Sequence, residues 1–272
     1  MQYALVGAGS VGKSFLAQLP RLTQQLGPVA AASSRLASRI ANTLGAGVPV
    51  KSMDALDSAR LILICVSKGS FDKVVGELSR ADITWERKIL LLCDSNLYSS
   101  ALPDFRVRGA FTGSVNPLAA LPKRFVVEGD PAAVQAAKYL VSELGGKSVG
   151  LNPDRMCGYD AALTFSSGLF TPLIESCVEC LHWAGVPGAA AGRIAEWLFQ
   201  RSLRSYLHAG RKSWSGSLAL GDENGVESEI EELREFDPLL AEYYRVSAIF
   251  ALEYFKRHPD LARRLGAGPE RE

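Results

Sequence analysis

The residues from Gly7 to Ser14, with the sequence GAGSVGKS, have the types and spacing needed to bind the phosphates of a nucleotide. They fit the pattern G-x-G-x-x-G of dinucleotide-binding folds and also the pattern G-x-x-x-x-G-K-[ST] of P-loops. Both patterns place glycines between a strand and a helix, so that backbone N–H groups can hold phosphate. The first predicts hydride transfer, and the second predicts nucleotide hydrolysis or phosphoryl transfer. In the dinucleotide interpretation the cofactor is contacted by Gly7, Gly9, Ser10, Val11 and Gly12.

A second segment favours the dinucleotide interpretation. Roughly 20 residues after the glycine loop, dinucleotide-binding folds carry an Asp or Glu that accepts a hydrogen bond from the 2′-hydroxyl group of NAD. This chain has Ser33, Ser34 and Arg35 there, after a small apolar run. A guanidinium group with hydroxyl neighbours suits a 2′-phosphate, which it can bind through two hydrogen bonds. The sequence therefore predicts NADP(H) as the cofactor, with the alternative that Arg35 only begins the next helix.

The P-loop alternative depends on an acidic residue that handles Mg²⁺ after an apolar strand. Asp94 follows the apolar run 89–93 and keeps this alternative open. The apolar run 61–66, however, is followed by Ser67 and Lys68 and by no acid. Because ligands of open α/β sheets bind at the carboxyl ends of strands, four more residues are predicted to line the cofactor site. They are Val66, Ser67, Lys68 and Ser95.

The elements that must position these residues alternate along the first half of the chain. Strands are predicted near residues 2–6, 29–33, 61–66, 89–93, 111–115, 124–128 and 147–151, and helices near 11–26, 35–45, 70–80 and 131–145. This alternation predicts an α/β Rossmann domain with a mostly parallel, doubly wound sheet. After residue 152 strand signals stop, and helices are predicted near 154–184, 189–210 and 224–257, the last with a break near Asp237. The wide apolar face of 154–184 predicts a helix that is covered on several sides. The predicted domains are 1–152 and 153–265, with a frayed tail at 266–272.

Composition limits the class of protein. Of the 272 residues, 47% are hydrophobic and 22% charged, which is ordinary for a globular protein, and the net charge of +1 gives no basic footprint for nucleic acid. No uninterrupted apolar run of membrane-spanning length and no secretory signal is recognisable, so we expect no membrane partner. Five scattered cysteines are expected to be reduced thiols, which indicates a cytoplasmic protein. The three histidines lie far apart and form no recognisable metal set.

Four segments together resemble the 6-phosphogluconate-dehydrogenase-like reductases, a group that includes the pyrroline-5-carboxylate reductases. Within that group the chain is most similar to Rossmann-like proteins with a C-terminal domain of unknown function. The resemblance covers nearly the whole chain and implies an all-helical second domain that pairs with a second copy, hence a homodimer. The segments that carry it are Gly7–Gly12, Ser114–Leu118, Phe125–Asp130 and Ser215–Asp222.

The chain departs from the pattern of this group where imidazoles are common. Asn116 stands before Pro117 in place of a His, and Tyr159-Asp160-Ala161 stands in place of Tyr-His-Ala. Asp160 is the first candidate for the proton donor, because burial on an apolar segment would make it an acid at neutral pH. It could equally be a first-turn acid that complements the helix dipole.

Two further residues are candidate substrate contacts. Asn116 is predicted to orient the substrate or the nicotinamide amide, or else to form a turn before Pro117. Ser167 is predicted to donate a hydrogen bond to the substrate, or else to be a small packing residue. The sequence thus predicts an NADP(H)-dependent oxidoreductase that acts on a small carbonyl or imine compound. The alternatives are a dinucleotide-binding sensor or scaffold without turnover and, more remotely, a P-loop nucleotidase.

Overall fold

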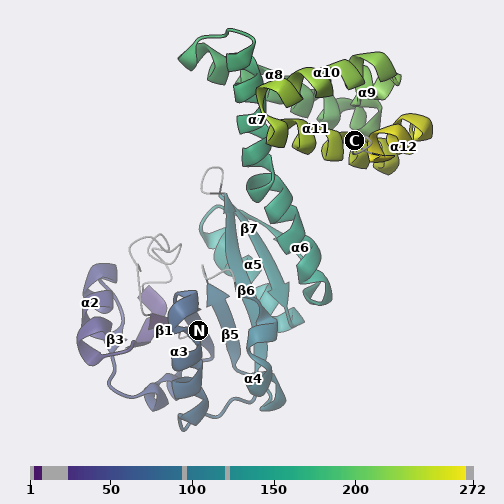
Figure 1. Cartoon of the computed structure of the whole chain (residues 1–272). Helices are drawn as coiled ribbons and strands as arrows, with labels where there is room; N and C mark the ends of the chain where they lie inside the picture. Colours follow the sequence, from purple (N-terminus) through teal and green to yellow (C-terminus); the bar gives the residue numbers. More distant parts are fainter. Residues whose placement is uncertain (1–2, 8–23, 94–96, 120–122, 268–272) are drawn as a thin grey trace. The chain divides into compact units, whose positions relative to one another are not determined.

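The computed structural model describes residues 3–7, 24–93, 97–119 and 123–267. The chain divides into two compact units, residues 1–160 and 161–272. The first unit holds a sheet with helices, and the described residues of the second unit form helices (Figure 1). The predicted boundary after residue 152 precedes helix α6 (Met156–Leu163), whereas the observed division falls within it. The predicted fold class, a Rossmann-type sheet followed by a helical unit, is confirmed.

The sheet of the first unit is mostly parallel. Among the described residues its strand order is β3-β2-β1-β4-β5-β6-β7-β8, and only β6 and β7 pair in antiparallel fashion. The stretch from β3 to β6 has the strand order of a dinucleotide-binding sheet, with the chain reversing direction across the sheet at β1. The strands are β1 (Tyr3–Gly7), β2 (Leu26–Ala30), β3 (Val48–Pro49), β4 (Leu61–Cys65), β5 (Ile89–Cys93), β6 (Phe111–Ala119), β7 (Arg124–Gly129) and β8 (Lys147–Gly150).

Helices cover both faces of this sheet because successive strand residues point to opposite faces. Leu5, Leu63 and Leu91 pack on one face with α2 (Ser34–Leu44) and α5 (Pro131–Glu143). Their strand neighbours pack on the other face with η3 (Met53–Ser58), α3 (Lys68–Arg80) and α4 (Pro103–Val107). The continuous apolar runs of β4 and β5 are therefore buried on both sides, as in other parallel sheets.

The second strand lies earlier in the chain than the sequence predicts. The prediction was 29–33, with residue 26 in the preceding helix, but β2 begins at Leu26 and ends at Ala30. Gly27 and Pro28 have the local chemistry of a turn, yet they lie inside the strand, next to a register shift between β1 and β2. Such an irregularity lets a strand tolerate Pro. As a result, residues 31–33 form the turn that leads into α2.

The second unit is built around a small apolar core. Residues of α10 (Glu223–Phe236), α11 (Pro238–Phe255) and α12 (Pro259–Ala267) form this core, which includes Ile230, Leu252 and Leu261. Asp237 separates α10 from α11, as predicted, and its carboxylate accepts the Leu239 N–H at 2.8 Å. The frayed tail was predicted to begin at residue 266, but Gly266 and Ala267 still belong to α12. The other elements after β8 are η5 (Pro153–Arg155), α8 (Gly188–Ala209), η7 (Gly210–Ser213) and α9 (Ser217–Leu220).

The segment predicted as one long covered helix is interrupted and exposed. A π-helical turn, η6 (Thr164–Gly168), separates α6 from α7 (Phe170–Trp183). Phe165 is 63% exposed and Leu169 is 50% exposed, so the prediction of a covered helix is wrong for the single chain. By length and composition alone, the helical stretch Pro153–Trp183 is apolar enough to cross a membrane, with a mean hydropathy of 1.2 over a window that is 0% buried. Charged residues such as Asp160 and Glu175 interrupt this stretch, so it is not an uninterrupted apolar run, and the absence of a membrane partner stays a prediction.

Candidate functional site at the carboxyl edge of the sheet

The strand ends that flank the reversal point lie side by side. Gly7 ends β1 and pairs with Cys65, the last residue of β4, while Val6 pairs with Ala30 at the end of β2. Because neighbouring strands are about 4.8 Å apart, the ends of β2 and β4 are separated by roughly 10 Å across β1. The structure thus brings Gly7 together with the starts of α2 and α3, where the predicted cofactor residues stand.

The first turn of α2 carries Ser33, Ser34 and Arg35. Ser33 is the N-cap, and its hydroxyl accepts the Leu36 N–H at 3.2 Å. All three side chains are exposed, and the first turn of α2 holds no acidic residue. A helix N-terminus with free N–H groups, hydroxyls and a guanidinium group attracts an anion such as a phosphate. Arg35 does lie in the first turn of the helix, as the alternative states. This position is also compatible with the predicted phosphate contact.

The first turn of α3 has a similar character. Val66 is buried under the sheet edge, whereas Ser67 is the exposed N-cap and Lys68 the first helical residue. The Ser67 hydroxyl lies 3.2 Å from the Ser70 hydroxyl, and no acidic residue occupies this turn either. The sequence placed Ser67 and Lys68 at the end of a strand, but they begin a helix. Their hydroxyl and ammonium groups consequently stand beside a second helix N-terminus.

Several predicted cofactor residues lie outside the described residues. These are Gly9, Ser10, Val11, Gly12 and Ser95, together with the P-loop residues Lys13 and Asp94. The placement of the glycine loop itself therefore stays a prediction, and only the elements on either side of it are described.

Asn116 lies in strand β6, at the same edge of the sheet. It stands one residue beyond Val115, which pairs with the last residue of β5, and it pairs across β6 and β7 with Val126. The alternative of a turn-forming Asn is therefore wrong, because the residue has a strand partner. Its side chain is only 3% exposed, and its Nδ2 donates to the Leu97 carbonyl at 3.3 Å and to the Ser114 hydroxyl at 3.4 Å. Asn116 thus ties β6 to the segment that follows β5.

A buried carboxylate holds the same segment from the next strand. Glu128 of β7 is 2% exposed and pairs with Ser114 across the sheet. Its two oxygens accept the backbone N–H of Ser99 at 2.8 Å and the Ser99 hydroxyl at 2.7 Å. Ser99, the first residue of η4 (Ser99–Ala101), is itself buried. A buried charge is tolerated when hydrogen bonds satisfy it, and here Ser99 supplies both.

Between these two anchors, Tyr98 points its hydroxyl to Asp160. The Tyr98 hydroxyl donates a short hydrogen bond to Asp160 Oδ1. Burial, followed by the hydrogen bond and the charge of Asp160, raises the pKa of the Tyr98 phenol well above its usual range. The phenol therefore remains protonated and acts as a donor. Asp160 is exposed, so the burial that would have made it an acid is not found in the structure.

Ser167 belongs to the helical unit and lies in the π-helical turn η6. Its hydroxyl donates to the Leu163 carbonyl at 2.8 Å, and the hydroxyl of Ser166 donates to the same carbonyl at 3.0 Å. Both side chains are exposed, so the packing alternative does not describe them. Single π-helical turns often occur at functional sites. Ser167 keeps its lone pairs as acceptors, while its proton is already donated within the helix.

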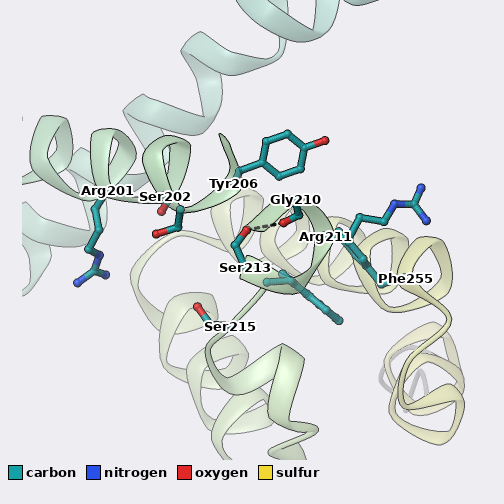
Figure 2. A pocket seen from close by; sticks show the side chains of 10 residues that line it. Arg201, Ser202, Tyr206, Gly210, Arg211, Ser213, Ser215 and Phe255 are labelled. Carbon is teal, nitrogen blue, oxygen red and sulfur yellow. Dashed lines mark hydrogen bonds between the residues drawn. The ribbon is translucent and has the colours of Figure 1, made fainter. Parts of the chain in front are cut away.

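The helical unit also has a pocket of its own, of about 310 Å³, between α8 and the segment around Trp214. Figure 2 shows Arg201 and Arg211 extending from opposite ends of this hollow, with the Ser213 hydroxyl donating to the Gly210 carbonyl at 2.8 Å. The Arg211 guanidinium lies over the Tyr254 ring, 4.9 Å from its centroid. Since these polar groups do not converge on one point, the pocket lacks the arrangement that catalysis requires.

The sequence candidates thus fall into two groups in the sheet unit. The starts of α2 and α3 form the predicted cofactor edge, and Asn116 and Asp160 are both joined to the segment 97–99. Sequence reasoning missed Tyr98, Ser99 and Glu128. Glu128 was detectable in part, since an acid within the apolar run of a strand indicates a buried, satisfied charge. Tyr98 gave no such signal, because its partner is 62 residues away.

Comparisons with known proteins agree with this architecture. Residues 124–249 match the family model described as a domain of unknown function, DUF2520. A comparison with curated proteins finds no match.

Among solved structures, a protein from Thermotoga maritima is 19% identical, with a TM-score of 0.63 over 90% of this chain and 96% of that chain. An imine reductase from Myxococcus stipitatus in complex with NADP⁺ is 16% identical, with a TM-score of 0.63 over 93% and 95%. A reductive aminase from Aspergillus terreus in complex with NADPH and ethyl levulinate is 15% identical, with a TM-score of 0.62 over 98% and 99%. At these identities the likeness establishes the fold. The chain therefore has a Rossmann-like sheet unit followed by a helical unit, and the match to DUF2520 runs from strand β7 of the sheet unit into helix α11 of the helical unit.

Proposed function

We propose that the protein is an NADP(H)-dependent oxidoreductase that acts on a small carbonyl or imine compound. The observation that carries this proposal is the start of α2, where Ser33, Ser34 and Arg35 stand beside the reversal point of the sheet and no acid is present in the first turn. Dinucleotides bind at this point in such sheets. The imine reductase and the reductive aminase named above are in complex with NADP⁺ and NADPH, respectively, which supports the same cofactor here.

The choice of NADP(H) over NAD(H) depends on the charge at the start of α2. An acid in this position would accept a hydrogen bond from a ribose hydroxyl and repel a phosphate. Arg35 instead offers a guanidinium fork, and the N-terminus of α2 adds a positive partial charge. Across β1, the ammonium group of Lys68 stands at the start of α3, where it is available to a second anionic part of the dinucleotide.

Arg35→Ala tests this assignment. We expect it to weaken NADPH binding by roughly 30-fold and NADH binding by less than about threefold, because only NADPH carries the phosphate that the guanidinium contacts. Isothermal titration calorimetry with both dinucleotides measures the two changes. Arg39→Ala, one turn later on the same helix and also exposed, is the matched control and should change neither affinity. Equal losses for NADPH and NADH in Arg35→Ala would contradict a 2′-phosphate contact.

The proposed substrate site is the polar cluster of Asn116, Tyr98 and Asp160. Hydride transfer needs a positioned cofactor, a polar grip on the substrate and a path for a proton. β6 stands three strands from β1, roughly 14 Å away at the usual spacing, so a dinucleotide extended along the edge would bring its reactive end toward this cluster. Asp160, Asn116 and, from the helical unit, Ser167 remain the candidate catalytic residues in this proposal.

A second candidate function is a dinucleotide-binding sensor or scaffold without turnover. Asn116 favours it, because an amide stands where the resembling group commonly has an imidazole, and this amide donates to the Leu97 carbonyl and to the Ser114 hydroxyl. A carboxamide, unlike an imidazole, is neither an acid nor a base near neutral pH, so Asn116 cannot transfer a proton to a substrate. NADPH binding without oxidation of the cofactor across a panel of aldehydes, ketones and cyclic imines would favour this candidate over the oxidoreductase.

We also propose a homodimer formed through the helical unit. Large apolar side chains remain exposed on several helices there, and exposed apolar surface of this kind can mark a protein–protein contact. Sedimentation of the purified protein should give twice the mass of one chain. A mass of one chain would contradict the proposal. If the protein could be purified only in detergent, the result would instead indicate that the stretch 153–183 contacts a membrane. The exposed side chains on α7, α8 and η6 are Phe165, Leu173, Trp197, Leu203 and Leu207.

A further inference from the structure

The pocket of the helical unit is built mainly by one stretch of chain. Helix α8 supplies one wall and the residues that follow it supply the other, together with Phe255 of α11. Gly210 has a φ of +57°, which turns the chain back after α8, and its carbonyl accepts the Ser213 hydroxyl at 2.8 Å. Because neighbours in sequence form both walls, the hollow of about 310 Å³ is present without a ligand and is large enough for a small one.

The charge of this pocket is positive. Arg201 and Arg211 line it, and none of its described lining residues is an Asp or Glu. The surrounding stretch 197–221 holds no acid, and its cations are Arg201, Arg204, Arg211 and Lys212. In the part of the chain that the structure describes, neither lining arginine forms an ion pair with a carboxylate. A hollow with such uncompensated charges attracts an anion and repels a cation.

The carboxyl end of α8 explains only one of these arginines. Cations near a helix C-terminus compensate its partial negative charge, and this effect fades beyond the last turn. Arg211 follows the end of α8 at Ala209 and is suited to this role. Arg201 lies roughly two turns before that end, so the helix dipole does not account for it.

Hydroxyl groups and aromatic rings complete the pocket. Ser202 lies on α8 and Ser215 on the segment across the hollow (Figure 2), and neither forms a side-chain hydrogen bond within the described residues. Their hydroxyl protons are therefore available to an oxyanion. Trp214 stacks on Phe255 with the ring centroids 4.5 Å apart and the planes at 11°. These rings suit a planar organic group, because aromatic rings attract one another in offset or edge-to-face contacts.

We propose that this pocket is a further binding site, for a small organic oxyanion with a planar part, such as an aromatic carboxylate or phosphate ester. The positive potential of the arginines selects the anionic group, the serine hydroxyls donate to it, and the planar part packs on Trp214. The site goes beyond the proposed oxidoreductase, since its described lining residues all belong to the helical unit and none is a predicted cofactor or catalytic residue.

Binding of benzoate, phenyl phosphate and benzamide to the full chain tests this site. Benzamide has nearly the shape of benzoate and no charge, so it reports the contribution of the ring and the amide alone. Dissociation constants are measured by NMR titration at low ionic strength. We expect the better of the two anions to bind at least about tenfold more tightly than benzamide, because hydrogen bonds to charged groups are the stronger ones. A preference for phenyl phosphate would assign a phosphate ester, and a preference for benzoate a carboxylate.

Two double variants separate the pocket from the general charge of α8. Arg201→Gln combined with Arg211→Gln removes both lining charges and should weaken binding of the preferred anion at least about tenfold, with benzamide unchanged. Arg193→Gln combined with Arg204→Gln makes the same change of charge at exposed residues of α8 that do not line the pocket. This matched control should leave all three affinities within about twofold of wild type. Thermal melting checks that both variants are folded, as expected for substitutions of exposed side chains.

Arg35→Ala distinguishes this pocket from the proposed cofactor site at the start of α2. It should leave anion binding unchanged, and a loss of anion binding in this variant would refute the pocket. No preference for either anion over benzamide, or equal losses in the two double variants, would also overturn the proposal. If NADPH fails to bind while the anion preference and its dependence on Arg201 and Arg211 persist, the oxidoreductase is refuted and the pocket remains supported.

Discussion

Gly129→Ala should destabilise the sheet unit by at least about 3 kcal/mol, the largest effect that we expect from a single methyl group in this protein. Gly129 ends β7 with a φ of +122°, a conformation that L side chains rarely adopt. A Cβ there would lie 2.3 Å from the Thr112 carbonyl oxygen and 2.5 Å from Gly113 Cα. Both contacts are to backbone of the neighbouring strand, so no side chain can move aside to relieve them.

Gly145→Ala is the matched control for this prediction. Gly145 also has a positive φ, of +67°, and a Cβ at this position would meet nothing within 4 Å. It should therefore cost only about 1 kcal/mol, the conformational penalty alone. Urea unfolding followed by circular dichroism compares the two variants. Similar losses in both would mean that the contact between β6 and β7 is looser than the structure indicates.

Glu128→Ala should destabilise the same unit by about 3 kcal/mol, because it leaves two buried donors of Ser99 without an acceptor. The N–H and the hydroxyl of Ser99 both donate to Glu128, and both residues are 2% exposed. Water cannot replace the carboxylate without entering the sheet edge. The substitution should also loosen the segment that carries Tyr98, because Ser99 anchors this segment to Glu128.

Glu128→Gln separates the effect of losing the hydrogen bonds from the effect of losing the negative charge. The amide has nearly the shape of the carboxylate, its oxygen can still accept the Ser99 N–H, and its NH₂ group can donate to the Ser99 hydroxyl. We expect a loss of about 1 kcal/mol, measured by the same urea unfolding. If Glu128→Gln were as damaging as Glu128→Ala, the negative charge itself would be the stabilising feature, which would contradict the hydrogen-bond account.

The fold was predictable because its signals are local. The apolar runs that became β4 and β5 are short, continuous and followed by helical patterns, which is typical of strands buried on both faces. Asp237, followed by Pro238, gave the break between α10 and α11 for the same reason. The bounds of β2 were missed because Gly27 and Pro28 have the local chemistry of a turn. The pairing with β1, which holds them in a strand, is a long-range contact that their sequence neighbours do not reveal.

The candidate site was predictable only where one element defines it. Ser33, Ser34 and Arg35 could be placed at a helix start from their neighbours alone. Asp160 could be singled out, but its surroundings could not, because Tyr98 comes from a segment 62 residues earlier. The wrong expectation of a buried Asp160 arose from the apolar residues around it on α6, which the structure leaves exposed. Sequence neighbours therefore identified the residue and misjudged its environment.

Parallel calorimetric titrations of the purified protein with NADPH, NADH and Mg-ATP test the central claim most directly. We expect micromolar binding of NADPH, much weaker binding of NADH and no response to Mg-ATP, because the exposed hydroxyl groups and cationic side chains at the starts of α2 and α3 suit a 2′-phosphorylated dinucleotide. Tight binding of Mg-ATP without any response to either dinucleotide would show that Gly7–Ser14 is a P-loop and would contradict the proposed oxidoreductase.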